Sequence, residues 1–214
     1  MSDVVRARSA EQKEQRMADI KSAAARLFET HPYHQITLTT IADELGWSRA
    51  NLYKYVTTKE EIFLLLMGDM RDAYTDDLLR ELASAPSDDA ATLATCWARV
   101  ATAHETYFRY GDLLYTVIET NVSLEKLMDF KRGYYDGLDS MCRTLASALG
   151  VRADDVPELT NTVYHHAVGL AGSCLNNPLV QQAVRQLGVE PTRPNFTSGM
   201  QDFITMCIKW YRRR

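Results

Sequence analysis

Apolar residues recur at helical intervals along most of this chain, and residues that break helices are scarce. Ile20, Ala23, Ala24, Leu27 and Phe28 fall at i, i+3, i+4, i+7 and i+8, as on one face of a helix. The chain has ten glycines and six prolines among 214 residues. This is a smaller share than the roughly 12% that these two residues together make up in average proteins. Because both residues are costly inside a helix, and because strand alternation is absent, the sequence predicts an all-α fold.

The helical pattern and its interruptions divide the chain into segments. A first helix is expected over about 11–30, because Pro32 pushes the residue before it out of helical geometry. We expect residues 1–57 to form one domain, 58–85 a connecting helix, and 86–214 a second helical domain. Further helices are expected over 88–109, 112–119, 123–148, 157–176, 178–187 and 196–212.

The charge is distributed unevenly. The net charge of −4 would by itself argue against a nucleic-acid binder, but residues 1–60 carry nine basic and eight acidic side chains. Residues 61–214 carry fifteen basic and twenty acidic ones. A nearly neutral N-terminal segment followed by an acidic remainder is compatible with DNA binding by the N-terminal segment alone.

Other compositional features favour a cytoplasmic protein. Cys96, Cys142, Cys174 and Cys207 are far apart in sequence, form no CxxC pair and have no close histidine, as expected of small apolar residues in a reducing compartment. The first residues lack the apolar core of a signal peptide. Polar residues and a proline interrupt the longest uncharged stretch, 159–184. We expect no metal, cofactor or membrane partner.

The most informative segment is residues 37–61, TLTTIADELGWSRANLYKYVTTKEE. Thr37 is placed to cap a short helix through Leu45, and Ser48 to cap a second one through about Tyr55. Gly46 lies between them and can adopt the positive φ of a tight turn. Two short helices joined in this way predict a helix-turn-helix.

The two faces of the second short helix differ in chemistry. Its underside, with Leu52 and Val56, is apolar, whereas the outward residues suit phosphates and the base edges of a major groove. These outward residues are Arg49, Ala50, Asn51, Tyr53, Lys54 and Tyr55. Thr58 and Glu61 form the Thr-x-x-Glu pattern of a capping box, which opens the connecting helix.

The segment from about Arg16 to Leu65 resembles the DNA-binding domain of TetR-family transcriptional regulators. The matching pieces are AAARLF, TLTTIA, LGWSRANLYKYV and TTKEEIF. The resemblance implies an all-helical homodimer that binds a palindromic operator in double-stranded DNA and responds to a small-molecule effector not identified by the sequence. It implies contacts to DNA from Thr37, Thr39, Ser48, Arg49, Ala50, Asn51, Tyr53, Lys54, Tyr55 and Lys59. Arg6 and Arg8, before the first helix, would extend this set as a basic arm.

The C-terminal half contains a candidate dimer interface. Gly169 and Gly172 would allow a partner helix to approach closely, and Phe203, Met206 and Trp210 form an apolar seam with Cys207 on the last helix. Helices 157–176 and 196–212 from two subunits would then form a four-helix interface. An intrachain core is the alternative for these residues.

A candidate effector site is harder to define. Aromatic residues and a few polar groups lie on the central helices, where they suit either a core or a ligand cage: Trp97, His104, Tyr107, Phe108, Tyr115, Glu119, Phe130, Tyr134 and His165.

Two other functions are weighed against a repressor released by an effector. One is a DNA-binding regulator controlled by a protein partner instead of a small ligand. The other is an all-helical enzyme with an incidental helical hairpin. Because GxGxxG, GxSxG, P-loop and HExxH patterns are all missing, we expect a regulator and not an enzyme.

Overall fold

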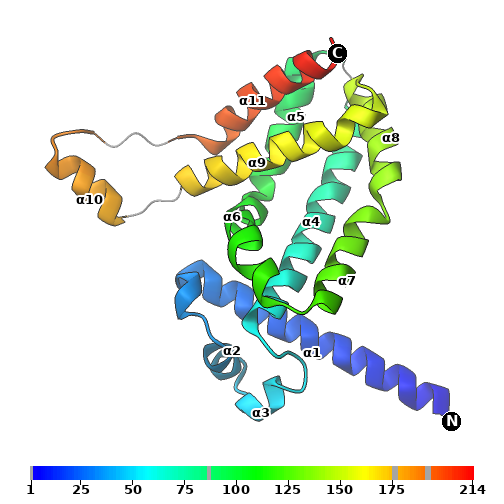
Figure 1. The fold of residues 1–214 in the computed structure, drawn as a ribbon, viewed down its shortest axis with the longest axis vertical. Coiled ribbons are helices and arrows are strands. Elements are labelled where there is room, and N and C mark those ends of the chain that lie inside the picture. Colours follow the sequence, from blue (N-terminus) through cyan, green and yellow to red (C-terminus); the bar gives the residue numbers. More distant parts are fainter. Residues whose placement is uncertain (1, 86–87, 175–177, 191–193) are drawn as a thin grey trace. The chain divides into compact units, whose positions relative to one another are not determined.

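The computed structural model describes residues 2–85, 88–174, 178–190 and 194–214, which contain helices and no strand (Figure 1). These helices group into two compact units. The first unit runs to Asp69 and includes Leu114–Arg132, and the second comprises Met70–Leu113 and Gly133–Arg214. The all-α prediction is confirmed.

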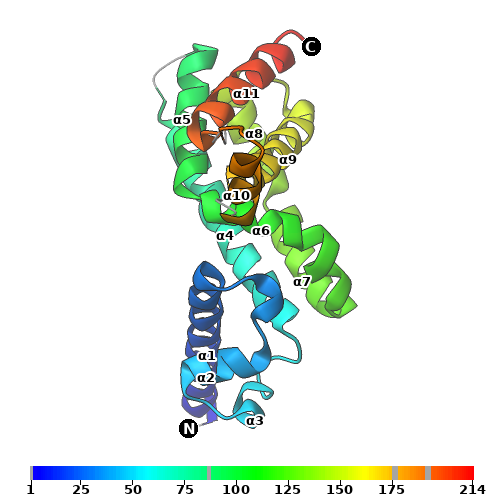
Figure 2. The ribbon, with the colours of Figure 1, turned by 90° about the vertical axis from the view of Figure 1, so that its left-hand side faces the viewer.

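The first unit is built around three N-terminal helices and the start of a fourth, which follow one another in blue and cyan in Figure 2. Its core includes Ile20, Ile41, Leu52, Val56 and Phe63, each at most 2% exposed. The elements are α1 (Ser2–Thr30), η1 (Tyr33–Gln35), α2 (Leu38–Leu45), α3 (Arg49–Leu52) and the first part of α4 (Lys59–Ala83), with η2 (Leu114–Ile118), η3 (Glu119–Asn121) and most of α7 (Leu124–Tyr135).

The second unit holds the larger core. Its elements are the rest of α4, α5 (Ala90–Ala103), α6 (Glu105–Leu113), α8 (Leu138–Leu149), η4 (Ala153–Asp155), α9 (Val156–Cys174), α10 (Pro178–Gln186) and α11 (Phe196–Tyr211). In Figure 1, α11 lies beside both α5 and α9. Trp97 of α5, Val163 of α9 and Ile204 of α11 are buried in one shared cluster.

Several helix boundaries differ from the expected ones. The expected helix over 88–109 divides at His104, which ends α5 with φ −111° and bonds through its ring to Asp77. The expected helix over 123–148 divides before Gly137, consistent with the low helix propensity of glycine. The first helix begins at Ser2 and not near residue 11, so Arg6 and Arg8 lie inside it and do not precede it.

The compact units also differ from the expected domains. Residues 114–132 group with the N-terminal helices, where the Phe130 ring approaches Gly68 closely enough to contact a Cβ there, at 3.7 Å. This contact between segments 62 residues apart in sequence leaves no periodic signal. The expected boundary at residue 86 and the expected helix end at 176 lie outside the described residues.

Candidate nucleic-acid interface

Thr37 begins the helix-turn-helix as its N-cap. The Thr37 side chain accepts a hydrogen bond from the Thr40 backbone N–H at 3.1 Å, and the Thr37 backbone N–H donates to Thr40 Oγ1 at 2.9 Å. These reciprocal bonds form a capping box in which threonine replaces the usual Glu or Gln. The predicted cap is confirmed, and α2 starts at a fixed point.

The turn between α2 and α3 adopts the predicted geometry. Gly46 has φ +66°, and the Trp47 N–H donates to the Ala42 carbonyl at 2.8 Å. Ser48 then caps α3 by accepting from the Asn51 N–H at 3.3 Å. α3 proper is shorter than expected, since it ends at Leu52 and continues as a turn to Tyr55.

The underside of α3 packs into the first unit. Leu52 is fully buried, and Val56 is 2% exposed. The Trp47 ring contacts the Tyr55 ring, at a centroid distance of 5.9 Å, and the Arg16 guanidinium of α1, at 5.2 Å. These contacts fix which side of α3 faces outward.

The opposite side, which we call the recognition face, is open to solvent. It consists of Arg49, Ala50, Asn51, Tyr53, Lys54 and Tyr55. Four of these are exposed, whereas Asn51 and Tyr55 are half-buried. Within the described residues, neither Arg49 nor Lys54 forms an ion pair with an acidic side chain. Both cations are thus available to an external anion.

The remaining predicted contacts from α2 and the turn lie at the start of the two short helices. Thr37 and Ser48 are exposed and Thr39 is half-buried. Thr37 and Ser48 cap their helices, so their backbone and hydroxyl groups lie where a phosphate would approach a helix N-terminus.

Lys59 is oriented differently from the outward-facing cation that we expected. Its ammonium donates to the carbonyls of Tyr33 and Ile36, at 2.9 and 2.8 Å, and lies 4.0 Å from the centre of the Tyr33 ring. Partial burial lowers the pKa of Lys59. Two of the three N–H donors of this ammonium are therefore used within the protein, and sequence periodicity offered no signal for these contacts.

The capping box at the start of α4 is only partly as expected. The Thr58 hydroxyl accepts from the Glu61 N–H at 3.3 Å, as predicted. However, the Glu61 carboxylate accepts from the backbone N–H of Thr57 at 3.1 Å and from its hydroxyl at 2.5 Å, rather than from Thr58. The carboxylate therefore holds the residue that leaves the helix-turn-helix.

Four of the nine candidate effector residues gather around a residue that the sequence reasoning missed. Tyr74 of α4 accepts a hydrogen bond from the Trp97 indole N–H at 2.7 Å. Its ring lies 5.2–5.8 Å from the rings of His104, Tyr107 and Phe108. Burial raises the pKa of Tyr74. Trp97 and Phe108 are buried in this cluster, so they contribute to the core of the second unit.

The other five candidate effector residues are not part of this aromatic cluster. Tyr115, Glu119 and Phe130 belong to the first unit, where Glu119 pairs with Lys131 at 2.5 Å. In the second unit, Tyr134 contacts the ring of Tyr135, and the exposed His165 contacts that of Tyr164. The nine residues are thus divided between two compact units.

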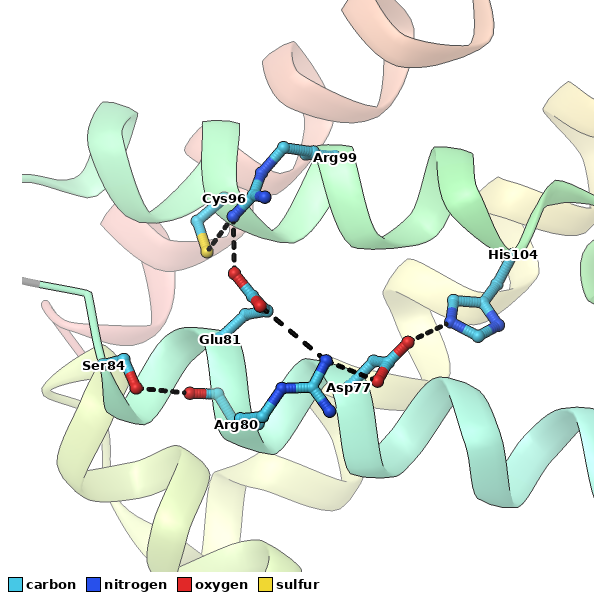
Figure 3. A network of polar contacts seen from close by, with 7 residues as sticks. All are labelled: Asp77, Arg80, Glu81, Ser84, Cys96, Arg99 and His104. Atoms are coloured by element: carbon cyan, nitrogen blue, oxygen red, sulfur yellow. Dashed lines mark hydrogen bonds and ion pairs between the residues drawn. The ribbon is translucent and has the colours of Figure 1, made fainter.

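A chain of polar contacts links α4 and α5 (Figure 3), and its His104 also contacts the Tyr74 ring of the aromatic cluster. His104 Nε2 donates to Asp77 Oδ2 at 2.8 Å, Arg80 pairs with Asp77 at 2.6 Å, and Arg99 pairs with Glu81 at 2.6 Å. The hydrogen bonds from His104 and Arg80 lower the pKa of Asp77. The His104–Asp77 and Arg99–Glu81 contacts join α5 to α4, whereas Arg80 and Asp77 both lie on α4. Exposed ion pairs contribute little to stability.

The candidate interface residues lie on the outer side of α9 and α11. Gly169 and Gly172 are exposed, and a Cβ at either would meet nothing within 4 Å. Met206 and Trp210 are 61% and 67% exposed. Phe203 is half-buried, and its ring stacks on His166 at 3.8 Å. The intrachain core therefore does not use Gly169, Gly172, Met206 or Trp210, whereas Cys207, expected on the same seam, is buried in it.

The described part of the chain contains no group of three or more His, Cys, Asp or Glu side chains arranged to hold a metal ion. Among its helices, none is long and apolar enough to span a membrane. Cys96, Cys142 and Cys207 are free thiols.

Comparisons with known proteins agree with this geometry. Residues 20–66 match the family model for bacterial regulatory proteins of the tetR family, and residues 69–212 match that for the tetracyclin repressor-like C-terminal domain. The nucleoid occlusion factor SlmA of Idiomarina loihiensis is 30% identical over 131 residues, which cover 60% of this chain and 59% of that protein.

A TetR/AcrR-family transcriptional regulator from Thermobifida fusca has a similar fold, with a TM-score of 0.52 and 18% identity over 93% of this chain and all of that chain. A TetR-family regulator from Mesorhizobium loti gives a TM-score of 0.48, also at 18% identity, over 93% of this chain and 96% of that one. Together with the two matched domains, which cover most of the sequence, the helix-turn-helix identifies this chain as a member of the TetR family of DNA-binding transcriptional regulators.

Proposed function

We propose that the protein is a homodimeric repressor that binds a palindromic operator through its recognition face and is released by a small-molecule effector. The observation that carries the DNA-binding part is the recognition face itself. Arg49 at the start of α3 and Lys54 in the turn that follows α3 are exposed cations without an acidic partner among the described residues, and Leu52 anchors this segment from beneath.

The chemistry of this face suits sequence readout. An arginine can donate two hydrogen bonds to guanine, and an asparagine can bond adenine in the same bidentate way. Arg49 and Asn51 provide these groups, while Lys54, Tyr53 and the capped N-terminus of α2 suit phosphates. We place Lys59 outside the set that touches DNA, because its ammonium is bound to the carbonyls of Tyr33 and Ile36.

Dimerisation is supported by the outer side of α9 and α11. Large apolar side chains such as Trp210 are costly to leave in water, and Gly169 and Gly172 leave room for a partner helix. A two-fold dimer would present two recognition faces, which must lie one DNA turn of about 34 Å, or a multiple of it, apart to meet major grooves on one side of the duplex.

The effector is proposed to act on the second unit. Its match to the tetracyclin repressor-like C-terminal domain and the aromatic cluster around Tyr74 support this part of the proposal. Aromatic faces favour flat apolar or cationic ligands, and Tyr74 and Tyr107 are the half-buried tyrosines of this cluster.

Selection and linkage together test this function. A duplex is first selected from a random pool with the purified protein, and small molecules are screened for an increase in melting temperature. The affinity of a stabilising compound is then measured with and without the selected duplex. An effector coupled by about 1–3 kcal/mol will lose about 5–150-fold in affinity when the duplex is bound. Equal affinities for every stabilising compound would refute release by a small molecule.

A further inference from the structure

The first turn of α4 holds both ends of the helix-turn-helix through three consecutive charged residues, Lys59, Glu60 and Glu61. We call these three residues the first-turn clamp. Lys59 and Glu60 bond the segment that enters α2, whereas Glu61 bonds the residue that leaves α3. All of these residues belong to the first unit.

The entry segment is bound at three atoms. The carbonyls of Tyr33 and Ile36 accept from the Lys59 ammonium, and the Tyr33 hydroxyl donates to Glu60 Oε1 at 2.9 Å. The Tyr33 ring packs edge-on against Phe63, at 5.0 Å between centroids, while the Ile36 side chain is 1% exposed. Burial, reinforced by Glu60, raises the pKa of Tyr33, so its phenol stays a donor.

One peptide unit connects the first-turn clamp to α2. The Ile36 carbonyl and the Thr37 N–H belong to the same rigid peptide unit. Its carbonyl accepts from Lys59, and its N–H donates to Thr40 in the capping box of α2. The orientation of α2 is therefore fixed to α4 on one side of this peptide unit and to its own first turn on the other.

The exit segment is bound in the same way. Glu61 is 9% exposed, and its two carboxylate oxygens accept from the N–H and the hydroxyl of Thr57. Thr57 follows the buried Val56 directly. A rotation of the first turn of α4 would consequently carry the entry to α2 and the exit from α3 together.

The same contacts argue against Lys59 as a phosphate ligand. Two of its three N–H donors are used by carbonyls, and the carboxylates of Glu60 and Glu61 stand in the same turn. A phosphate would have to displace these bonds and approach two negative charges. We propose that Lys59 is a positioning residue for operator recognition, which sets the angle of the recognition face without touching DNA. This inference rests on the proposed recognition face.

The test compares Lys59→Met with Lys54→Met, a matched change at an exposed lysine of the recognition face. Each variant is titrated with a duplex selected by the wild type and with a scrambled duplex, over a range of salt concentrations. Lys59→Met will lose about tenfold affinity for the selected duplex, equivalent to one misplaced base contact, and keep its affinity for the scrambled one. The slope of log affinity against log salt will stay unchanged. Lys54→Met will flatten this slope by about 0.9, as expected for one lost phosphate contact.

Two results would overturn the proposal. One is a flattened slope for Lys59→Met with equal losses on both duplexes, which is the signature of a phosphate contact. The other is a folded Lys59→Met protein with unchanged affinity for the selected duplex. If Lys59→Met does not fold, Glu61→Gln gives a milder loosening of the exit segment, and the same pattern of specific loss at constant slope is expected. The proposed recognition face is tested separately by Arg49→Ala, because a folded Arg49→Ala protein that binds as the wild type does would refute the face whatever the result for Lys59→Met.

Discussion

Replacing Gly169 by leucine should weaken the association of two chains and leave the fold of each chain intact. In the single chain a Cβ at Gly169 meets nothing within 4 Å, and the position is exposed. The change also replaces glycine in the interior of α9, where glycine costs about 0.8–1.0 kcal/mol relative to alanine. The substitution should therefore leave the fold of the chain intact and its helix content unchanged or higher.

The same substitution should destabilise a dimer. If α9 meets a partner helix at Gly169, a leucine there overpacks the interface at a cost of typically 1–3 kcal/mol. A two-fold axis places the substitution in the interface twice. The expected loss is about 2–6 kcal/mol, which weakens association by roughly 30-fold to more than 10⁴-fold.

Sedimentation equilibrium measures this loss directly, with circular dichroism as the check on folding. Gly137→Leu is the matched control, since Gly137 is also exposed, also has nothing within 4 Å of a Cβ, and lies at the start of α8, outside the proposed interface. We expect Gly137→Leu to remain dimeric and Gly169→Leu to sediment as a folded monomer. A Gly169→Leu protein that dimerises as tightly as the wild type would refute the interface.

Three further predictions concern folding. Leu52→Ala removes a fully buried side chain beneath α3 and should lower the free energy of unfolding by about 2–5 kcal/mol in a urea titration, and a loss below 1 kcal/mol would contradict the anchoring role of Leu52. Gly111→Ala places a Cβ 2.5 Å from Val168 Cγ2 and 2.6 Å from the Tyr164 hydroxyl oxygen, so a loss of about 1–3 kcal/mol is expected, and an unchanged melting temperature would show that α6 and α9 are not closely packed there. Hydrogen bonds from Arg152 lower the pKa of Asp155, so the wild type should be more stable than Asp155→Asn near neutral pH and lose this advantage as the pH falls below about 4; an advantage that persists at pH 2 would exclude the ion pair as its source.

Local signals account for what could be predicted from the sequence. Thr37, Gly46 and Ser48 each act on atoms within four residues, so residue type and spacing were sufficient to place both caps and the turn. The outward direction of Arg49 and Lys54 follows from the helical period once Leu52 is placed in the core. The recognition face was predictable for this reason.

Contacts between distant segments account for what could not be predicted. Lys59 turns inward because the carbonyls of Tyr33 and Ile36 come within its reach, across more than twenty residues of sequence. Tyr74 lies at the centre of the aromatic cluster only because α4 packs against α5 and α6. The spacing of apolar residues predicts which face of a helix is buried, but it does not predict which residues of distant segments that face contacts.

The central claim is that the recognition face reads DNA sequence, and Arg49→Ala tests it most directly. The wild type and the variant are titrated against the selected duplex and against duplexes that each carry one changed base pair. We predict a loss of about 1–3 kcal/mol on the selected duplex, with discrimination relaxed at one position in each half-site and the fold unchanged by circular dichroism. A folded Arg49→Ala protein with the affinity and base preferences of the wild type would contradict the account.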